Sequence, residues 1–114
     1  MEDTGLRIGD VAERTGLSIR TLRHYGEVGI VSPSGYTPGG FRLYSEADIE
    51  RIMLIRRMKP LEFTLDEMRE FLDAADHPDD PAARETIDRF RTEARARLEK
   101  LRRRVGYADE FLRL

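Results

Sequence analysis

The sequence predicts a mainly α fold, in which short helices and one hairpin precede a long amphipathic helix. Two short helical segments, at about residues 8–15 and 19–26, are separated by a turn that contains glycine. A stretch rich in glycine, proline and aromatic residues follows and ends near residue 44. After Pro81, apolar residues recur at heptad spacing, which predicts one long helix with an apolar seam.

The first helix is expected to end at Gly16, because glycine readily adopts the left-handed conformation that stops a helix. Ile8, Val11 and Ala12 share its apolar face. Leu17 anchors the turn that follows. Two short helices joined by a turn of three or four residues containing glycine are typical of a helix-turn-helix.

The second helix is predicted from about Ile19 to Gly26, with Ser18 as its N-cap. Ile19 and Leu22 are expected to face inward, because residues three apart share a helix face.

A hairpin is predicted next, with an extended segment over 30–33, a tip at 38–40 and a return strand over 41–44. The return strand alternates Phe41, Arg42, Leu43 and Tyr44. Phe41 and Tyr44 are expected to pack in the core and fix the hairpin. A hairpin that directly follows a helix-turn-helix is called a wing. The first half of the chain is therefore predicted to be a winged helix-turn-helix.

Two capping boxes predict the next two helices. Ser45 with Asp48 begins one helix, which Pro60 ends, and Thr64 with Glu67 begins another that runs to about Ala74. The expected buried face of the second of these helices consists of Leu65, Met68, Phe71 and Leu72. Three methionines at helical core spacing, Met53, Met58 and Met68, are interpreted as packing residues.

The last helix is predicted to begin at Pro81, capped by Asp80, and to form a coiled coil with a second copy. Gly106 should weaken it by about 1 kcal/mol relative to alanine. The run Arg102-Arg103-Arg104 is interpreted as a solvated face. The predicted dimerisation residues are Ile87, Phe90, Ala94, Leu98, Leu101, Val105, Ala108 and Leu112.

Composition limits the possible functions. Cysteine is absent, which excludes disulfides and thiolate metal ligands, and the two histidines, His24 and His77, lie in different segments, so no metal site is expected. No phosphate-binding loop or nucleophile–base pair is present, so neither an enzyme nor a cofactor is expected. The net charge is −2, but residues 61–80 hold eight acidic and only one basic residue, which leaves the first half compatible with binding phosphate.

Membrane association is not expected, because no apolar run is long enough to span a bilayer. No secretory signal is recognisable at residues 1–10, so the chain is expected to be cytoplasmic.

Basic, hydroxyl and aromatic residues on the second helix and the wing predict an interface with double-stranded DNA. Arg20 is expected to read a base, whereas Arg23 and Arg42 are expected to hold phosphate. The alternative is a solvated helix surface and, for His24, packing on the wing. The predicted DNA-binding residues are Ser18, Arg20, Thr21, Arg23, His24, Tyr25, Tyr36, Gly40 and Arg42.

Several motifs in fixed order resemble the MerR family of bacterial transcription regulators over roughly residues 6–75. They are Ile8-Gly9-Asp10-Val11-Ala12, Thr15-Gly16-Leu17-Ser18, Thr21-Leu22-Arg23-His24-Tyr25, Gly29-Ile30-Val31, Pro33, Gly40-Phe41-Arg42-Leu43-Tyr44 and Asp48-Ile49. The resemblance implies a homodimer joined by an antiparallel coiled coil, with the second helix in the major groove and the wing on the flanking backbone. It also implies that the dimer bends and untwists promoter DNA, with RNA polymerase as a further partner.

The sequence departs from the family pattern at four places, one of which is His24, where tyrosine is commoner. Gly26 stands where an acidic residue is usual, and Glu62 stands where glycine is usual before Phe63. The chain ends at Leu114, just after the coiled coil, so the family's sensing step is not carried over and a small-molecule effector is not expected. The expected domains are a winged helix-turn-helix DNA-binding domain over 1–75, then a linker and coiled-coil dimerisation helix over 76–114.

Two hypotheses remain open from the sequence. The first is a sequence-specific regulator that binds promoter DNA as a homodimer and bends it. The second is a small architectural or protein-interaction module on DNA, controlled by a partner protein rather than by a ligand. Sequence-selective binding with local untwisting would favour the first hypothesis, and a tight protein partner with weak DNA selectivity would favour the second.

Overall fold

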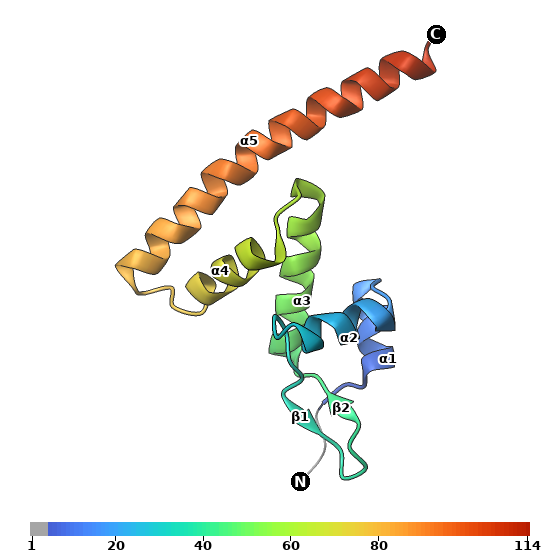
Figure 1. The fold of residues 1–114 in the computed structure, drawn as a ribbon, viewed down its shortest axis with the longest axis vertical. Coiled ribbons are helices and arrows are strands. Elements are labelled where there is room, and N and C mark those ends of the chain that lie inside the picture. The colour runs from blue at the N-terminus through green and yellow to red at the C-terminus, as the bar shows by residue number, and fades with distance from the viewer. Residues whose placement is uncertain (1–4) are drawn as a thin grey trace. The chain divides into compact units, whose positions relative to one another are not determined.

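The computed structural model describes residues 5–114, and these are mainly helical, as the sequence predicts (Figure 1). The chain divides into two compact units, Met1–Arg57 and Met58–Leu114. In order, the elements are α1 (Ile8–Thr15), α2 (Ile19–Glu27), β1 (Gly35–Tyr36), β2 (Arg42–Leu43), α3 (Glu46–Met58), the 3₁₀ helix η1 (Lys59–Leu61), α4 (Leu65–Ala75) and α5 (Pro81–Leu112). The domain division expected after residue 75 stays a prediction.

The turn between α1 and α2 has the geometry of a helix-turn-helix. Gly16 adopts φ 73°, and its N–H donates to the carbonyl oxygen of Ala12 at 2.9 Å. Thr15 is fully buried beside it, and its hydroxyl donates to the carbonyl oxygen of Val11 at 2.8 Å. Ser18 caps α2, because its Oγ accepts the N–H of Thr21 at 3.0 Å. Local hydrogen bonds therefore fix the angle at which α2 leaves α1.

The wing is a two-stranded antiparallel hairpin, in which Gly35 pairs with Leu43 and Tyr36 with Arg42. Gly40 adopts φ 86° at its tip, a conformation that glycine tolerates without strain. The chain before α1 adds a further pairing that the sequence patterns did not reveal. Leu6 and Tyr44 exchange two backbone hydrogen bonds of 2.8 Å. The return strand of the wing is thus held on both sides.

The base of the wing is fixed by the buried carboxylate of Asp48. Its Oδ2 accepts the N–H of Ser45 at 2.8 Å, and Ser45 Oγ accepts the N–H of Asp48 at 3.1 Å, which confirms the predicted capping box. The same Oδ2 accepts the N–H of Ser34 at 3.1 Å and its hydroxyl at 2.6 Å. One side chain therefore joins the start of α3 to the residue before β1.

The core of the first unit confirms part of the predicted packing and corrects the rest. Leu22 and Tyr44 are buried at 1% exposure, as predicted. Ile19 is 38% exposed, because it opens α2 at the edge of the face centred on Leu22 and Tyr25. Phe41 is 61% exposed, because it follows the tip glycine and lies outside the paired strands. The expectation that Phe41 and Ile19 face the core is therefore wrong.

In the second unit, α4 packs along the first half of α5. Its predicted capping box is present, since Thr64 Oγ1 accepts the N–H of Glu67 at 3.1 Å and the carboxylate of Glu67 accepts the N–H of Thr64 at 2.8 Å. Phe90 of α5 is 5% exposed, and its ring centre lies 5.5 Å from those of both Phe63 and Phe71. Phe90 is therefore a core residue of its own unit, and its predicted part in dimerisation stays a prediction.

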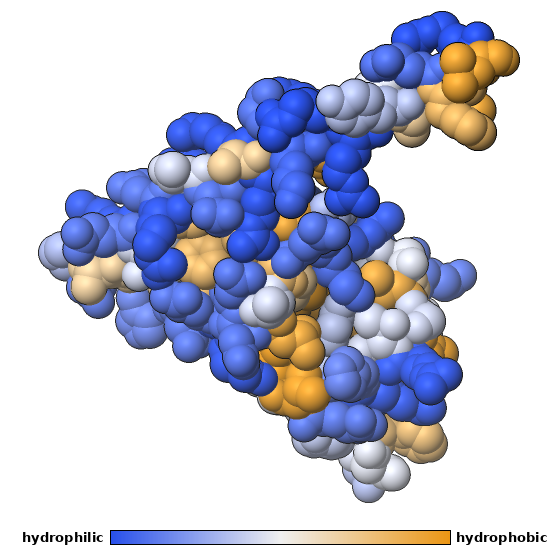
Figure 2. Space-filling view, turned by 45° about the horizontal axis from the view of Figure 1, so that its top comes forward, coloured by the Kyte–Doolittle hydropathy of each residue, from blue (hydrophilic) through white to orange (hydrophobic). Residues whose placement is uncertain are grey.

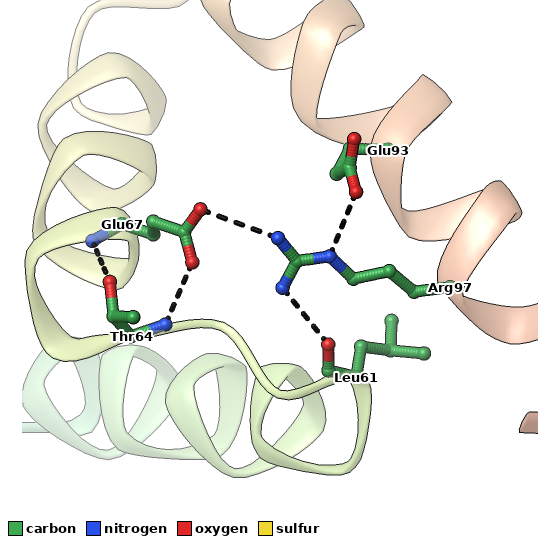
Figure 3. Close-up of polar contacts among 5 residues, drawn as sticks. All are labelled: Leu61, Thr64, Glu67, Glu93 and Arg97. Atoms are coloured by element: carbon green, nitrogen blue, oxygen red, sulfur yellow. Dashed lines mark hydrogen bonds and ion pairs between the residues drawn. The ribbon is translucent and has the colours of Figure 1, made fainter.

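Arg97 joins α5 to the start of α4 (Figure 3). Its guanidinium donates to the carbonyl oxygen of Leu61 at 3.1 Å and to the carboxylates of Glu67 at 3.4 Å and Glu93 at 2.9 Å. The same group lies 4.2 Å from the centre of the Phe63 ring. The N–H of Thr64 lowers the pKa of Glu67, and the charge of Arg97 lowers it further.

The connection between α3 and α4 contains a backbone conformation that side chains rarely adopt. As predicted, α3 ends just before Pro60, and η1 follows. Glu62 closes η1 with φ 61°, and its carboxylate lies 3.8 Å from the guanidinium of Arg104. Because an L side chain in the left-handed region costs about 1–2 kcal/mol, Glu62 is a strained position.

The C-terminal half of α5 keeps large apolar side chains exposed. Exposure is 37% at Leu98, 54% at Val105 and 80% at Leu112. Figure 2 shows hydrophobic residues gathered at the C-terminal end of this helix, where Phe111 is 72% exposed. Over residues 5–114, no helix is both long and apolar enough to cross a membrane.

Candidate nucleic-acid interface

The exposed face of α2 carries most of the predicted DNA contacts. Arg20, Arg23 and His24 are all exposed, and they lie at helical spacing opposite the buried Leu22. Ser18 and Thr21 stand at the start of the same helix, where the hydroxyl of Ser18 donates to Thr21 Oγ1 at 2.9 Å. These two hydroxyls are thus engaged in capping the helix that presents the arginines.

Tyr25 occupies a different environment from its neighbours on α2. Its side chain is only 2% exposed, and its ring lies 6.4 Å from that of His24, centre to centre. The sequence prediction placed Tyr25 on the contact surface with His24. The structure places the ring in the core, because Tyr25 follows Leu22 by three residues on the inward face.

The wing presents a second group of candidate residues. Tyr36 is 62% exposed and lies directly across the hairpin from Arg42. Phe41, at the tip, lies beneath the guanidinium of Arg7, which is 4.9 Å from the ring centre. Arginine over an aromatic face is a favourable arrangement that keeps the charge available to an anion.

Three arginines from three separate segments line one cavity of about 240 Å³ in the first unit. They are Arg7 before α1, Arg23 of α2 and Arg42 of β2, and Ile8, Gly40 and Phe41 complete the lining. Arg42 Nη1 is buried and has no hydrogen-bond partner within residues 5–114. No carboxylate lines the cavity, so every charged side chain in its lining is positive.

The arginines of this surface differ from many of those elsewhere in the described chain. Arg14 is bound by both carboxylate oxygens of Glu46 at 2.7 and 2.9 Å, and Arg89 pairs with Glu70 at 2.6 Å. Arg20, Arg23 and Arg42, in contrast, form no ion pair with any residue that the structure describes. Unpaired guanidinium groups around a concave surface suit a phosphate, which accepts charge-assisted hydrogen bonds.

Sequence reasoning missed Arg7 and Phe41 as members of this surface. Arg7 precedes the first helix and lies far from the wing in the chain, so no local pattern joins the two residues. Gly40 was predicted to lie at the interface, and it does line the cavity. Within the described residues, no group of three or more metal-ligating side chains is present.

Comparison with known proteins agrees with this geometry. Residues 6–75 match the model of the MerR HTH family regulatory protein, and residues 49–106 match that of the MerR DNA-binding region. The chain belongs to the MerR family. The resemblance inferred from the motifs is thereby confirmed, and the MerR-family homologues are transcription regulators and not enzymes.

Individual MerR proteins resemble different lengths of the chain. The HTH-type transcriptional activator mta of Bacillus subtilis is 47% identical over 72 residues, which are 63% of this chain and 27% of mta. The HTH-type transcriptional activator TipA of Streptomyces coelicolor is 35% identical over 107 residues, which are 92% of this chain and 40% of TipA. The chain thus spans well under half the length of these two MerR relatives.

One solved structure is similar over nearly the whole chain. It is MtaN, the N-terminus of the Bacillus subtilis multidrug transporter activator, with a TM-score of 0.63 and 37% sequence identity. The match covers 95% of this chain and 92% of MtaN. The winged MerR fold described above is therefore shared with a protein of similar extent.

Proposed function

We propose that this MerR-family chain is a sequence-specific transcription regulator that binds promoter DNA as a homodimer and bends and untwists it. The observation that carries the proposal is the cavity between α2 and the wing, which three arginines line without a carboxylate. The cavity lies beside the exposed face of α2. A DNA phosphate bound in it would hold α2 in position on the DNA while Arg20 reaches a base. The mta and TipA proteins, both named transcriptional activators, support the assignment.

The residues divide into two roles under this proposal. Arg20 lies on the exposed face of α2 and would read a guanine through two hydrogen bonds in the major groove. Arg23, Arg42 and Arg7 would hold one or two phosphates, which position the helix but do not read sequence. His24 and Tyr36 flank these arginines and would contact the sugar-phosphate backbone. Ser18 and Thr21 would contribute mainly by holding the first turn of α2.

The homodimer is proposed from the exposed apolar seam of α5. Leu98, Val105 and Leu112 remain accessible in a single chain, although helix surfaces of this kind are usually covered by a partner. A two-fold dimer would present two copies of α2 to two half-sites of the promoter. RNA polymerase is the further partner proposed from the family, and the site of action would be the cytoplasm, where bacterial promoters lie.

We also propose that DNA binding is constitutive or is controlled by abundance or by a protein partner. The absence of cysteine excludes a thiolate metal site within these 114 residues. Thermal-shift measurements with metals, metabolites and cationic dyes would test the proposal. A ligand present at a hundredfold excess over its Kd should add about 2.7 kcal/mol of stability. A saturable shift that also changes the affinity for DNA would contradict constitutive binding.

Selection of bound sequences from random DNA, followed by footprinting, tests the regulator function. A regulator should enrich a two-fold symmetric sequence, protect both half-sites and leave the central base pairs reactive to probes of untwisting. The alternative is an architectural or protein-interaction module. It would bind without enrichment of any sequence, and this result would overturn the proposal.

A further inference from the structure

The apolar seam of α5 consists of two sets of residues at seven-residue steps. One set holds Ile87, Ala94, Leu101 and Ala108, and the other holds Leu98, Val105 and Leu112. Inside the second unit these side chains are covered only in part, and their exposure increases toward the C-terminus. A partner helix is needed to bury them, and the sequence of the seam restricts how that helix can lie.

The resemblance to the MerR family implies an antiparallel coiled coil; within that arrangement, we propose that a second copy of α5 covers this seam in one register, with Leu98 opposite Leu101 of the second copy. The same register places Val105 opposite Ala94 and Leu112 opposite Ile87. Each contact occurs twice because the pairing is two-fold symmetric. The inference rests on the proposed homodimer and goes beyond it, because it states which residues meet.

Neighbouring registers bury the seam less well. A shift of one heptad in one direction places Leu101 opposite the charged Arg91 and leaves Leu112 beyond the start of the partner helix. A shift in the other direction leaves Ile87 beyond Leu112, the last residue of α5. In the proposed register both ends of the seam are covered. Its one mixed layer sets Ala108 against Arg91, whose aliphatic stem can lie along the methyl group.

One aromatic contact beside the seam supports the same register. Phe90, Arg97, Arg104 and Phe111 follow one another at seven-residue steps, so they share one flank of α5. The first three contact residues 61–63, between η1 and α4 in their own unit, at Phe63, Leu61 and Glu62 respectively. Phe111 lies beyond these elements and is 72% exposed.

Antiparallel helices bring equivalent flanks together, so Phe111 of the second copy would lie beside Phe90. A cavity of about 230 Å³ is present there, lined by Phe63 and Phe90 with Arg89 and Arg97 above the rings and with Glu67 and Glu93. An aromatic side chain suits such a site, because aromatic pairs and arginine–ring contacts are favourable. The register therefore explains an exposed aromatic residue that the seam alone leaves unexplained.

Charged pairs at the edge do not decide the register. On the opposite flank, the register sets Arg95 near Arg102 of the second copy and Asp88 near Asp109. All four residues are exposed, and exposed charge pairs of either sign contribute little and are screened by salt. Burial of ten large apolar side chains, five from each copy, outweighs them.

Cysteine cross-linking tests the register directly, because the native chain has no cysteine. The variant Ala94→Cys/Val105→Cys should form a covalent dimer on mild oxidation. Its two thiols cannot join within one helix, since eleven residues at 1.5 Å each separate them by about 16 Å. Either single variant, Ala94→Cys or Val105→Cys, should stay monomeric on a denaturing gel. Ala94→Cys/Leu112→Cys and Ile87→Cys/Val105→Cys report the two shifted registers and should also stay uncoupled.

The remaining outcomes would overturn the inference. Coupling of a single-cysteine variant would indicate a parallel dimer, and coupling of a shifted pair would indicate another register. A dimer in sedimentation that no pair cross-links would show that another surface is used, while the proposed function would stand. A monomer at micromolar concentration would overturn the proposed homodimer itself.

A second measurement separates the Phe111 contact from the seam. Phe111→Ala should raise the dimer dissociation constant at least tenfold. The matched control is Tyr107→Ala, which removes a residue of 70% exposure on another face of α5 and should change the constant less than twofold. Equal effects of the two variants would contradict the placement of Phe111 beside Phe90.

Discussion

A β-carbon placed on Gly26 would lie 3.7 Å from Nη1 of Arg42. The glycine belongs to α2 and the arginine to the wing, so the two elements meet at the edge of the arginine-lined cavity. MerR proteins usually carry an acidic residue at the position of Gly26. In this chain no carboxylate stands there, and the Arg42 guanidinium is left available to an anion.

Gly26→Glu should therefore weaken DNA binding. The new carboxylate would pair with Arg42 and take the place of one phosphate contact, so the slope of log K against log salt should fall by about 1. The uncharged control, Gly26→Gln, should retain the slope of the parent protein. Binding titrations on one duplex at several salt concentrations would measure both. If Gly26→Gln and Gly26→Glu reduce the slope equally, the bulk of the new side chain and not its charge is responsible.

Arg23→Ala and Arg20→Ala should differ in their effect on sequence preference. Arg23 lines the cavity, and its loss should weaken all DNA sites about equally. Arg20 lies outside the cavity lining, and its loss should relax preference at one base pair per half-site by about 1–3 kcal/mol. Competition binding across a set of mutated operators separates the two. A uniform loss for Arg20→Ala would contradict base reading.

Glu62→Gly should stabilise the second unit. The substitution removes a side chain from a φ of 61° and should contribute about 1 kcal/mol, less the small value of an exposed ion pair with Arg104. Glu62→Gln keeps the strained backbone and serves as the control, with no gain expected. Urea unfolding of both variants measures the difference. A glycine variant no more stable than the glutamine variant would show that Glu62 carries no strain.

The stability of the second unit should depend on the charge of Glu67. Its pKa is lowered in the folded state, first by the Thr64 N–H and then by Arg97. A lowered folded pKa adds stability above the unfolded value of about 4.3, and that stability is lost as the pH falls through the folded pKa. Glu67→Gln should therefore have a lower Tm at pH 6, and the difference should vanish in stronger acid.

The control for this experiment is Glu50→Gln, which changes an exposed carboxylate of α3 in the other unit. Its Tm should stay close to that of the parent across the same pH range, because an exposed surface substitution changes stability little. A constant difference for Glu67→Gln would mean that the carboxylate charge does not stabilise the fold.

Short-range patterns predicted the local structure well. The capping boxes of Asp48 and Glu67 were predicted because cap and partner lie three residues apart, so that the sequence itself shows the pair. The arginines of α2 were predicted to be exposed for the same reason, since helical spacing separates them from Leu22. Their contact with DNA stays a prediction.

Such short-range patterns could not predict contacts between segments that lie far apart in the sequence. The pairing of Arg7 with Phe41 depends on where the wing meets the chain before α1, and no local spacing shows it. Phe90 illustrates a related difficulty. The heptad repeat indicates that one side of α5 is apolar, but it does not show which part of that side α4 covers and which part is left for a partner.

The backbone pairing of Leu6 with Tyr44 makes the segment around Leu6 part of the unit that carries the proposed DNA interface. This pairing fixes the position of the wing tip relative to α2. A tag attached before Leu6 is therefore not structurally neutral. Under the proposed function, a fused tag or an altered start site that loosened this pairing would weaken operator recognition without changing any residue that is proposed to contact DNA. DNA binding measured with an N-terminally tagged protein would then include an effect of the tag. A tag after Leu114 would leave the pairing of Leu6 with Tyr44 unchanged.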